Sequence, residues 1–355
     1  MERNKLLFIY SSSYNHISSA DILSYLQGDT SSGKSRLNPQ GVKKIAGKSE
    51  FLETAEKIIA FCGKHDITII TYLDPTYPEK LRNIESAPPV LYVRGDSSVL
   101  EGFSGAVVGS RKPTLSGLRF CRNFVGEMVL HGIPVISGFA RGIDSCAHRA
   151  SLEMNGKTVA VLGSGVDVIY PRENEKLYSE VVEAGCVLSR FPPGTKPMGR
   201  NFPVRNSIIA ALTDFVCVIE AARRSGSLIT ARFGAEYGKE VFSVPGNPLF
   251  PQSEGTNGLI KMGAHPLTGI SDILEAFGLS PGKRRVMSNE KTKEHHDNLT
   301  RLERKLLDLL TGEMSLEEIS SIANDDIGQV SAAMVTLEIK NRVKRGGDGY
   351  YFRLV

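Results

Sequence analysis

Short apolar runs alternate with amphipathic segments along the middle of the chain, from Gly105 to about residue 278. The apolar runs are rich in valine and isoleucine and lie at Ala106–Gly109, Pro134–Ser137, Thr158–Gly163, Cys186–Ser189, Phe215–Glu220 and Val241–Pro245. Helical patterns separate them, at Leu118–Leu130, Asp144–Asn155, Glu173–Ala184, Arg205–Leu212, Ser227–Tyr237 and Asn257–Met262. Strands that alternate with helices form βαβ units, and continuous apolar runs indicate strands buried on both faces. The pattern therefore predicts an α/β fold with an extended Rossmann-like, mostly parallel sheet.

Both flanks of this region have a different pattern. Residues 1–62 read as short helices, and two strands at Ile67–Thr71 and Pro89–Val93 follow, so the Rossmann-like domain extends over residues 63–278 around a core at 105–278. Residues 279–298 are polar and contain Pro281 and Gly282, which is typical of a linker. Residues 299–355 contain three amphipathic helical patterns and a terminal hairpin, and this order predicts a C-terminal winged helix. The helices are expected at Arg301–Leu310, Leu316–Ala323 and Ile327–Asn341, and the hairpin strands at Val343–Arg345 and Tyr350–Leu354.

Composition narrows the class of protein only moderately. The chain has 355 residues and a formal net charge of +4, which permits a polyanionic partner without requiring one. Its five cysteines are odd in number and too widely spaced for a zinc knuckle or a redox CxxC pair. A reducing compartment fits best, and no apolar stretch reaches the length of a membrane span. We expect a cytoplasmic protein with no membrane contact, no metal and no cofactor.

Two glycine-rich motifs lack the context that would give them a function. Gly28–Ser35 matches the phosphate-binding pattern GxxxxGK[ST], but the preceding segment looks helical and Pro39 and Gly41 follow. That loop works only between a buried strand and a long helix, so a polar loop is the better interpretation. Gly163-Ser164-Gly165 resembles part of a dinucleotide fingerprint, but its third glycine position holds Val168 and no helix opens at once.

Asp144 and His148 lie four residues apart on one predicted helix, as a metal pair or an acid–base pair would. The alternative is that Asp144 caps the helix and His148 is a packed, hydrogen-bonded side chain. Because no third ligand is evident nearby, we favour the structural interpretation and expect no catalytic residue and no metal site.

Small residues and cations gather where the strands end. Val108-Gly109-Ser110-Arg111 ends the first strand of the core, Ser137-Gly138 ends the second, and Phe202, Arg205 and Asn206 open a helix further on. Glycine and serine let backbone amides approach phosphate oxygens, arginine adds bidentate bonds, and an aromatic ring can stack on a base. Because the carboxyl ends of parallel strands share one edge, we expect a polyanion groove there. Its candidate DNA-binding residues are Gly109, Ser110, Arg111, Ser137, Gly138, Arg141, Phe202, Arg205, Asn206, Gly226 and Ser227.

An ordered series of motifs resembles the DprA family, also called Smf, the DNA-processing proteins of natural transformation. The motifs are Tyr77-Pro78-x-x-Leu81, Pro88-Pro89-Val90-Leu91-Tyr92-x-x-Gly95, Val108-Gly109-Ser110-Arg111, Ser137-Gly138-x-Ala140-x-Gly142-Ile143-Asp144-x-x-Ala147-His148, Tyr170-Pro171, Phe202-Pro203-x-Arg205-Asn206 and Pro245-Gly246. The resemblance is dense over residues 65–277 and rests on architecture alone at both ends.

The resemblance implies a homodimer formed through the Rossmann-like domain, single-stranded DNA binding, and loading of RecA recombinase onto the bound strand. It places the DNA contacts of the family on Ser110, Arg111, Ser137, Gly138, Phe202, Arg205 and Asn206. Two positions depart from the family pattern. Ser207 stands where a second arginine is usual, and Arg190 stands where a glutamate is usual.

Two other classes of function remain as alternatives. A Rossmann-type nucleotide phosphoribohydrolase would need a catalytic acid on the helix that Gly226-Ser227 opens, and Thr230 occupies that place. A transcription regulator led by the winged helix is disfavoured because residues 299–355 carry eight basic and nine acidic side chains.

Overall fold

The computed structural model describes residues 2–14, 17–27, 39–48, 50–279, 299–310, 314–340, 342–345 and 349–353. The chain divides into two compact units, residues 1–286 and 287–355. The phosphate-loop-like segment Gly28–Ser35 and the predicted linker lie largely or wholly outside the described residues.

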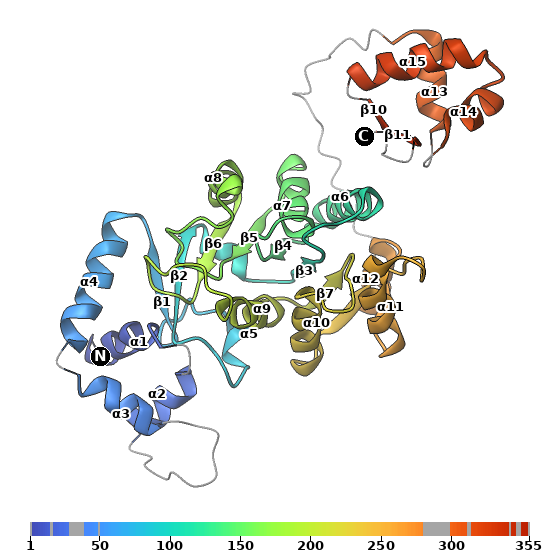
Figure 1. Ribbon diagram of the computed structural model, residues 1–355. Helices are drawn as coiled ribbons and strands as arrows, with labels where there is room; N and C mark the ends of the chain where they lie inside the picture. The colour runs from blue at the N-terminus through green and yellow to red at the C-terminus, as the bar shows by residue number, and fades with distance from the viewer. Residues whose placement is uncertain are drawn as a thin grey trace. The chain divides into compact units, whose positions relative to one another are not determined.

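The first unit is built on one large sheet, which the described strands form in the order β1-β2-β6-β5-β4-β3-β7-β8-β9 (Figure 1). These strands are β1 (Thr68–Thr71), β2 (Val90–Gly95), β3 (Gly105–Val108), β4 (Val135–Ser137), β5 (Thr158–Val161), β6 (Cys186–Ser189), β7 (Phe215–Val218), β8 (Glu240–Ser243) and β9 (His265–Pro266). The seven strands from β3 to β9 pair in parallel, and only β2 with its two neighbours pairs antiparallel. The extended Rossmann-like, mostly parallel α/β fold predicted from the sequence is confirmed.

Helices cover both faces of this sheet (Figure 1). On one face, α7 packs on β3, β4 and β5, α6 packs beside α7, and α8 packs on β5 and β6; on the other, α9 packs on β4 and β5 and α10 on β7 and β8. Their bounds are α6 Leu115–Leu130, α7 Ile143–Glu153, α8 Glu175–Ala184, α9 Asn201–Leu212 and α10 Ser227–Glu236. Three further short helices belong to this unit, α5 (Glu79–Arg82), α11 (Glu254–Lys261) and α12 (Ile270–Ala276). The β strands in the middle of the sheet are buried on both faces, as continuous apolar runs require.

Four N-terminal helices pack at the β1–β2 end of the sheet: α1 (Glu2–Ser11), α2 (Ser19–Leu26), α3 (Pro39–Ala46) and α4 (Phe51–Lys64). Their apolar side chains form one cluster with the sheet, in which Phe8 and Tyr92 are fully buried. The Tyr92 hydroxyl lies 2.8 Å from the Ser12 hydroxyl, so the strand and the helical region share a polar contact as well.

The second unit has a small apolar core of its own around Leu306, Ile319, Met334 and Leu337. It consists of α13 (Arg301–Leu309), α14 (Leu316–Ala323), α15 (Ile327–Ile339) and a hairpin of β10 (Val343–Arg345) and β11 (Tyr351–Arg353). Side chains of Thr300, Ser315 and Asp326 cap the three helices and so define where each begins. Three helices followed by a hairpin are the elements of a winged helix, and that assignment stays a prediction.

The order of strands creates one topological switch point. After β3 the chain moves outward through β4, β5 and β6, then returns to place β7 on the other side of β3. Loops on either side of such a point diverge and leave a crevice at the carboxyl edge of the sheet, where ligands bind in open α/β folds. The residues that follow β3, β4 and β7 are therefore the ones positioned to form a site.

Candidate nucleic-acid interface

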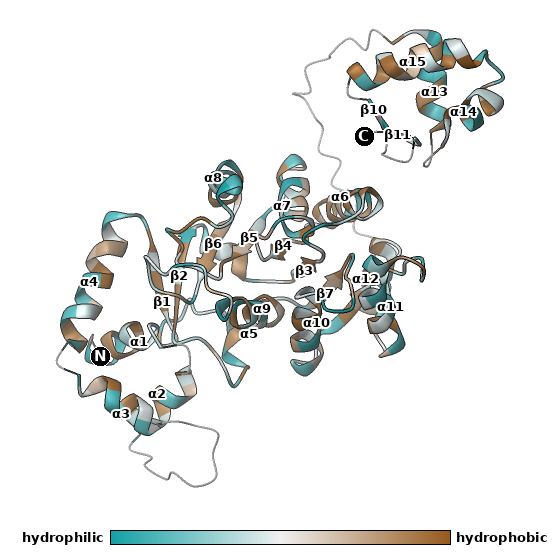
Figure 2. Cartoon of the chain, viewed as in Figure 1, coloured by the Kyte–Doolittle hydropathy of each residue, from teal (hydrophilic) through white to brown (hydrophobic). Residues whose placement is uncertain are grey.

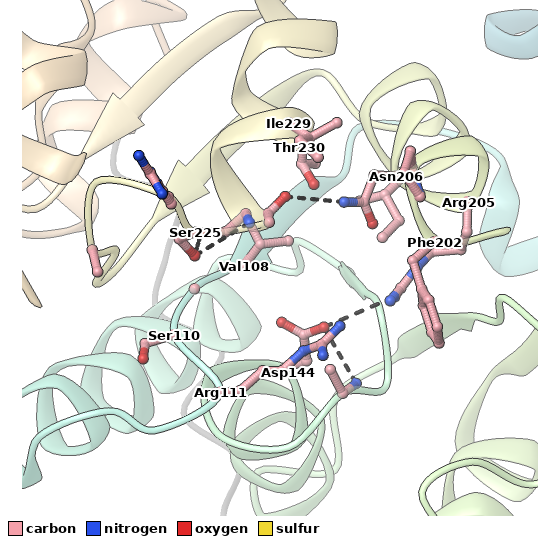
Figure 3. Close-up of a pocket in the computed structure, with 18 of the residues that line it drawn as sticks. Val108, Ser110, Arg111, Asp144, Phe202, Arg205, Asn206, Ser225, Ile229 and Thr230 are labelled. Atoms are coloured by element: carbon pink, nitrogen blue, oxygen red, sulfur yellow. Dashed lines mark hydrogen bonds and ion pairs between the residues drawn. The ribbon is translucent and has the colours of Figure 1, made fainter. Parts of the chain in front are cut away.

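A cavity of about 750 Å³ lies at the switch point (Figure 3). It is lined by the turn after β3 from Val108 to Lys112, by the first turns of α9 and α10, and by the loop that precedes α10. Its cationic lining residues are Arg111, Lys112, Arg205 and Arg224, and its one carboxylate is Asp144. A second cavity of about 40 Å³ shares Arg111, Phe202 and Arg205 with the first.

Arg111 extends from the β3 turn over the aromatic platform of the site. Its guanidinium carbon lies 5.6 Å from the centroid of the Phe202 ring, and the side chain is exposed. The hydroxyl of Ser110 accepts a hydrogen bond of 3.1 Å from the backbone N–H of Lys112, which holds the turn that presents both cations. An exposed guanidinium stacked on a ring keeps its hydrogen-bond donors available to a phosphate or a base.

Beneath the cavity, Arg205 and Asp144 form a buried pair (Figure 3). Arg205 Nη1 lies 3.9 Å from Asp144 Oδ2 and donates to the Val161 carbonyl at 3.3 Å. Gly138 makes this possible, because a Cβ there would lie 1.6 Å from Arg205 Nη1. The glycine after β4 is therefore required by the close approach of the guanidinium to the backbone.

Burial shifts the pKa values of both members of this pair. Burial raises the pKa of Asp144, and the charges of Arg205 and Arg111 oppose that rise. Burial also lowers the pKa of Arg205 to about 10, against the effect of Asp144. Arg205 Nε has no hydrogen-bond partner, so the pair does not satisfy all the donors of the guanidinium.

Phe202 lies at the boundary of the two cavities, on the first turn of α9. Its ring packs against Gly163, where a Cβ would lie 3.0 Å from Cδ1, and its centroid is 6.0 Å from that of Tyr170. Arg111 and Arg205 both lie within 6 Å of the ring centroid, at 5.6 and 5.7 Å. The half-buried Phe202 ring is thus held in place by Gly163, Tyr170 and the two arginines. In this position it can stack on a planar group.

Polar contacts join α9 to the loop before α10. Asn206 Nδ2 donates to the Gly226 carbonyl at 3.1 Å, and the hydroxyls of Ser225 and Ser227 lie 2.8 Å apart. These bonds fix the exposed Gly226 at the N-terminus of α10, the end at which the helix dipole favours an anion.

The structure brings most of the sequence-derived candidates together. Those that line the large cavity are Gly109, Ser110, Arg111, Phe202, Arg205, Asn206, Gly226 and Ser227. Gly138 and Arg141 line the smaller cavity instead. Arg141 donates two hydrogen bonds of 2.7 Å to Glu173, so the carboxylate of Glu173 already neutralises its charge. Ser137 lines neither of the two, since its buried hydroxyl donates to the Val107 carbonyl at 2.6 Å.

Lys112 and Arg224 line the large cavity and were missed by the sequence interpretation. Both lie next to the turns from which the candidate DNA-binding residues were chosen. Lys112 follows Arg111, and Arg224 precedes Ser225-Gly226. A search for cations flanking the glycine and serine turns would have found both.

His148 and Asp144 do not act on a common ligand. His148 is fully buried, and its Nδ1 lies 2.8 Å from the Thr158 hydroxyl, whereas Asp144 accepts from the Ala140 N–H at 3.3 Å. Burial, together with the charges of Arg205 and Arg149, lowers the pKa of His148 to about 3, so the ring is neutral. Among the described residues no group of three His, Cys, Asp or Glu side chains could hold a metal ion.

The two departures from the resembled pattern fall outside the cationic lining. Arg190 is buried, its Nη2 lies 3.4 Å from the Ile17 carbonyl, and it lines neither cavity. Ser207 is buried, and its hydroxyl donates to the Val204 carbonyl at 2.8 Å. Arg190 therefore does not replace a cation that Ser207 lacks.

The remaining glycine motif is a structural turn. Nine residues lie between Gly165 and α8, so Gly163-Ser164-Gly165 does not open that helix. The Gly163 carbonyl accepts from Asn201 Nδ2 at 3.0 Å, which anchors the start of α9 beside the cavity. No helix in the described part of the chain is long and apolar enough to cross a membrane.

Comparison with known families identifies one match over this unit. The family model described as DNA recombination-mediator protein A matches residues 68–278. Protein Smf of Synechocystis sp. is 36% identical over 336 residues, which are 86% of this chain and 84% of the relative. DNA processing protein DprA of Streptococcus pneumoniae is 41% identical over 209 residues, 58% of this chain and 72% of the relative.

Two solved structures share the fold. DNA processing protein A from Streptococcus pneumoniae superposes with a TM-score of 0.65 at 34% identity, and the match covers 77% of this chain and 97% of that one. DNA processing protein A from Helicobacter pylori, whose structure was solved for its single-stranded DNA binding mode, gives a TM-score of 0.55 at 28% identity. That match covers 59% of this chain and 95% of the other.

Proposed function

Because the chain belongs to the DNA recombination-mediator protein A family, whose members are also named DprA or Smf, we propose that it binds single-stranded DNA at the switch-point cavity. The observation that carries this proposal is the lining of the cavity, which contains four cations, one carboxylate and a ring that can stack on a base. Cations that neutralise phosphates provide affinity without reading sequence, and an aromatic ring stacks on any unpaired base. Duplex DNA keeps its bases stacked inside, so Phe202 favours the single strand.

In this proposal each part of the site has a role. Arg111, Lys112 and Arg224 contact phosphates, the backbone N–H groups of the Gly109-Ser110 and Gly226-Ser227 turns donate to further phosphate oxygens, and Phe202 stacks on a base. Asp144, Gly138 and Arg205 are positioning residues, because they form the floor on which the β3 turn and α9 rest. Arg141 contributes less charge, since Glu173 is bound to it.

The protein carries out no covalent chemistry on the strand in this proposal. The carboxylate of the cavity, Asp144, is buried and held by Ala140 N–H and Arg205, and Thr230 occupies the α10 position where a phosphoribohydrolase would need its acid. The enzyme alternative is therefore not favoured.

We also propose that the chain forms a homodimer through its first unit and helps load RecA recombinase on the bound strand. The most exposed large apolar side chains of this unit flank α11: Leu249 is 84% exposed, Met262 78% and Phe250 56%. Large apolar side chains exposed to this extent are candidates for a protein contact. Sedimentation of the wild type and of Leu249→Glu would test the dimer, and RecA ATPase activity on strands already coated by a single-strand-binding protein would test loading.

The primary test is a salt titration with a labelled oligo(dT), the matching duplex and nucleoside monophosphates as separate ligands. We expect binding to the single strand, with a log–log salt slope of about −0.7 for each phosphate neutralised. Tighter binding to the duplex, or release of free base from the monophosphates, would contradict the proposal.

A further inference from the structure

The contact between α6 and α7 brings together two cysteines that are far apart in the sequence. Cys121 is on α6 and Cys146 is on α7, and the two helices pack side by side (Figure 1). Cys121 Sγ lies 3.8 Å from the Ile143 carbonyl oxygen, and Cys146 Sγ lies 3.5 Å from the Leu118 carbonyl oxygen. Each sulfur therefore lies against the helix turn that leads into the other cysteine, and the two side chains are hydrogen-bonded to each other.

The two thiols differ in their access to solvent. Cys121 is fully buried in an apolar cluster with Phe124 and Val125, and Figure 2 shows hydrophobic residues along α6. Cys146 is partly exposed. A small polar oxidant in solvent can therefore reach Cys146 but not Cys121.

Two arginines lie near Cys146. Arg149 is exposed and lies one turn further along α7, and Arg122 of α6 binds Glu153 of α7 at 3.1 Å. The pKa of Cys146 is lowered, first by the hydrogen bond from Cys121 and also by the charges of the two arginines, against the opposing effects of burial and Glu153. Because the thiolate is the nucleophilic form of cysteine, a partly exposed thiol beside cations is the kind that reacts.

The other three cysteines lack these features. Cys62, Cys186 and Cys217 are buried. Burial raises the pKa of Cys62 to about 11 and that of Cys186 to about 12, and it also raises the pKa of Cys217. These thiols stay protonated and shielded from an oxidant in solvent, so they serve as internal references.

We propose that Cys146 is a site of oxidation by peroxides and that Cys121 resolves it as an intramolecular disulfide between α7 and α6. The Cys146 thiolate attacks one oxygen of hydrogen peroxide, the O–O bond breaks, and hydroxide leaves, which gives a sulfenic acid. The Cys121 sulfur then attacks the sulfenic sulfur, the S–S bond forms, and the leaving hydroxide takes the Cys121 proton as water. In total, two thiols and one peroxide give one disulfide and two waters, and a thiol reductant reverses the bond.

The disulfide joins two helices that both start from the turn after β3. The Thr114 hydroxyl caps α6 by accepting from the Gly117 N–H at 3.0 Å, and the Ile143 N–H at the start of α7 donates to the Ser110 carbonyl at 3.1 Å. The bond also closes a loop between residues 121 and 146, which restricts the unfolded chain. Oxidation should therefore raise the urea concentration at which the first unit unfolds. The inference does not rest on DNA binding, because it uses only the chemistry and the packing of the two helices.

Peptide mapping of the full-length chain tests the site. The reduced chain is treated with a small excess of hydrogen peroxide, its remaining thiols are blocked with N-ethylmaleimide in denaturant, and it is digested with trypsin. Trypsin releases Cys121 within residues 120–122 and Cys146 within residues 142–149, so a disulfide between these two peptides is identified by its mass. We expect this linked peptide, its loss on treatment with dithiothreitol, and recovery of the three buried reference cysteines as maleimide adducts.

Serine variants separate the roles of the two cysteines. In Cys121→Ser the sulfenic acid on Cys146 has no resolving thiol, so dimedone should label it. In Cys146→Ser the same peroxide treatment should leave Cys121 as a free thiol. The matched control is Cys62→Ser, at a buried cysteine on α4, and it should form the linked peptide like the wild type. Circular dichroism shows whether each variant is folded.

Recovery of both Cys121 and Cys146 as free thiols after peroxide treatment of the wild type would overturn the proposal. Dimedone labelling of Cys121 in folded Cys146→Ser would also overturn it, because Cys121 would then be the thiol that peroxide attacks. A urea midpoint that is the same for the linked and the reduced chain would contradict the expected stabilisation.

Discussion

Arg111 and Phe202 lie 5.6 Å apart at the mouth of the cavity, and their contributions to DNA binding differ in kind. Arg111→Ala removes a charge-assisted bond to phosphate, so we expect a loss of about 1.5–3 kcal/mol in binding free energy and a shallower salt slope. Fluorescence anisotropy at several salt concentrations measures both. The control is Arg149→Ala, which removes an exposed arginine on α7. This variant should bind oligo(dT) like the wild type.

Phe202→Ala should weaken binding by about 1–3 kcal/mol through loss of a stacking platform. Because no charge is removed, the salt slope should equal that of the wild type. The same titration distinguishes the two variants. If Phe202→Ala changes the slope as much as Arg111→Ala does, the ring is acting through the position of Arg111 rather than by stacking.

Arg205 is expected to affect stability more than binding. Its side chain is 4% exposed and lies against buried Asp144, so Arg205→Ala leaves a buried carboxylate without its partner. Removing one member of a buried pair costs about 3–5 kcal/mol of folding free energy. Urea denaturation should show this loss, and Asp144→Asn in the same chain should recover part of it. No recovery would show that the two side chains are not coupled.

At the scale of single elements, the packing of α7 on β5 makes folding sensitive to acid. His148 on α7 is fully buried against Thr158 on β5, and its pKa is lowered to about 3 from an ordinary 6.5. The unfolded chain therefore binds a proton below pH 6.5 that the folded chain does not, and stability falls as the pH drops from 6.5 towards 3. At pH 5 the loss from this residue is about 2 kcal/mol.

The measurement is the free energy of unfolding at pH 7 and pH 5 for the wild type and for His148→Gln. The glutamine side chain cannot take up a proton in this range, so the variant should lose less stability between the two pH values. The rest of the chain is the same in both proteins and cancels in the comparison. An equal loss in both proteins would show that His148 is not the group responsible.

Elements with a clear signal at their boundaries were the ones that the sequence predicted well. β6 and α14 begin and end at the predicted residues, because an apolar run and a clear N-cap define them. β9 and α12 were not predicted. β9 has two exposed residues, His265 and Pro266, and becomes a strand only by pairing with β8, so no apolar run marks it. α9 begins at Asn201, four residues before the predicted start, because Pro203 is tolerated in a first turn.

The candidate site was predictable only where proximity follows from topology. Glycine and serine turns follow β3, β4 and β7. Because the sheet is parallel there, the carboxyl ends of these strands lie at one edge, and the turns had to meet at that edge. The topology did not predict which side chains face the cavity. Ser137 turns to the Val107 carbonyl and Arg205 turns inward to Asp144, and both choices depend on packing between β3, β4 and α9. Sequence identifies such residues as neighbours, but their direction is set by tertiary contacts.

At the scale of the whole molecule, the two units are expected to divide the work. The cavity with its four cations is formed entirely by residues of the first unit. The second unit carries eight basic and nine acidic side chains between residues 299 and 355, which gives it no excess of positive charge for a phosphate backbone.

A chain that ends near Leu279 keeps the whole sheet, its core and the cavity. We therefore expect this truncated chain to stay folded and to keep most of its affinity for single-stranded DNA. Side-by-side anisotropy titrations of the two chains at one salt concentration measure this, with the oligonucleotide short enough for one protein to bind, so that self-association does not enter. A hundredfold loss on truncation, about 2.7 kcal/mol, would make the second unit a principal DNA site and contradict the division.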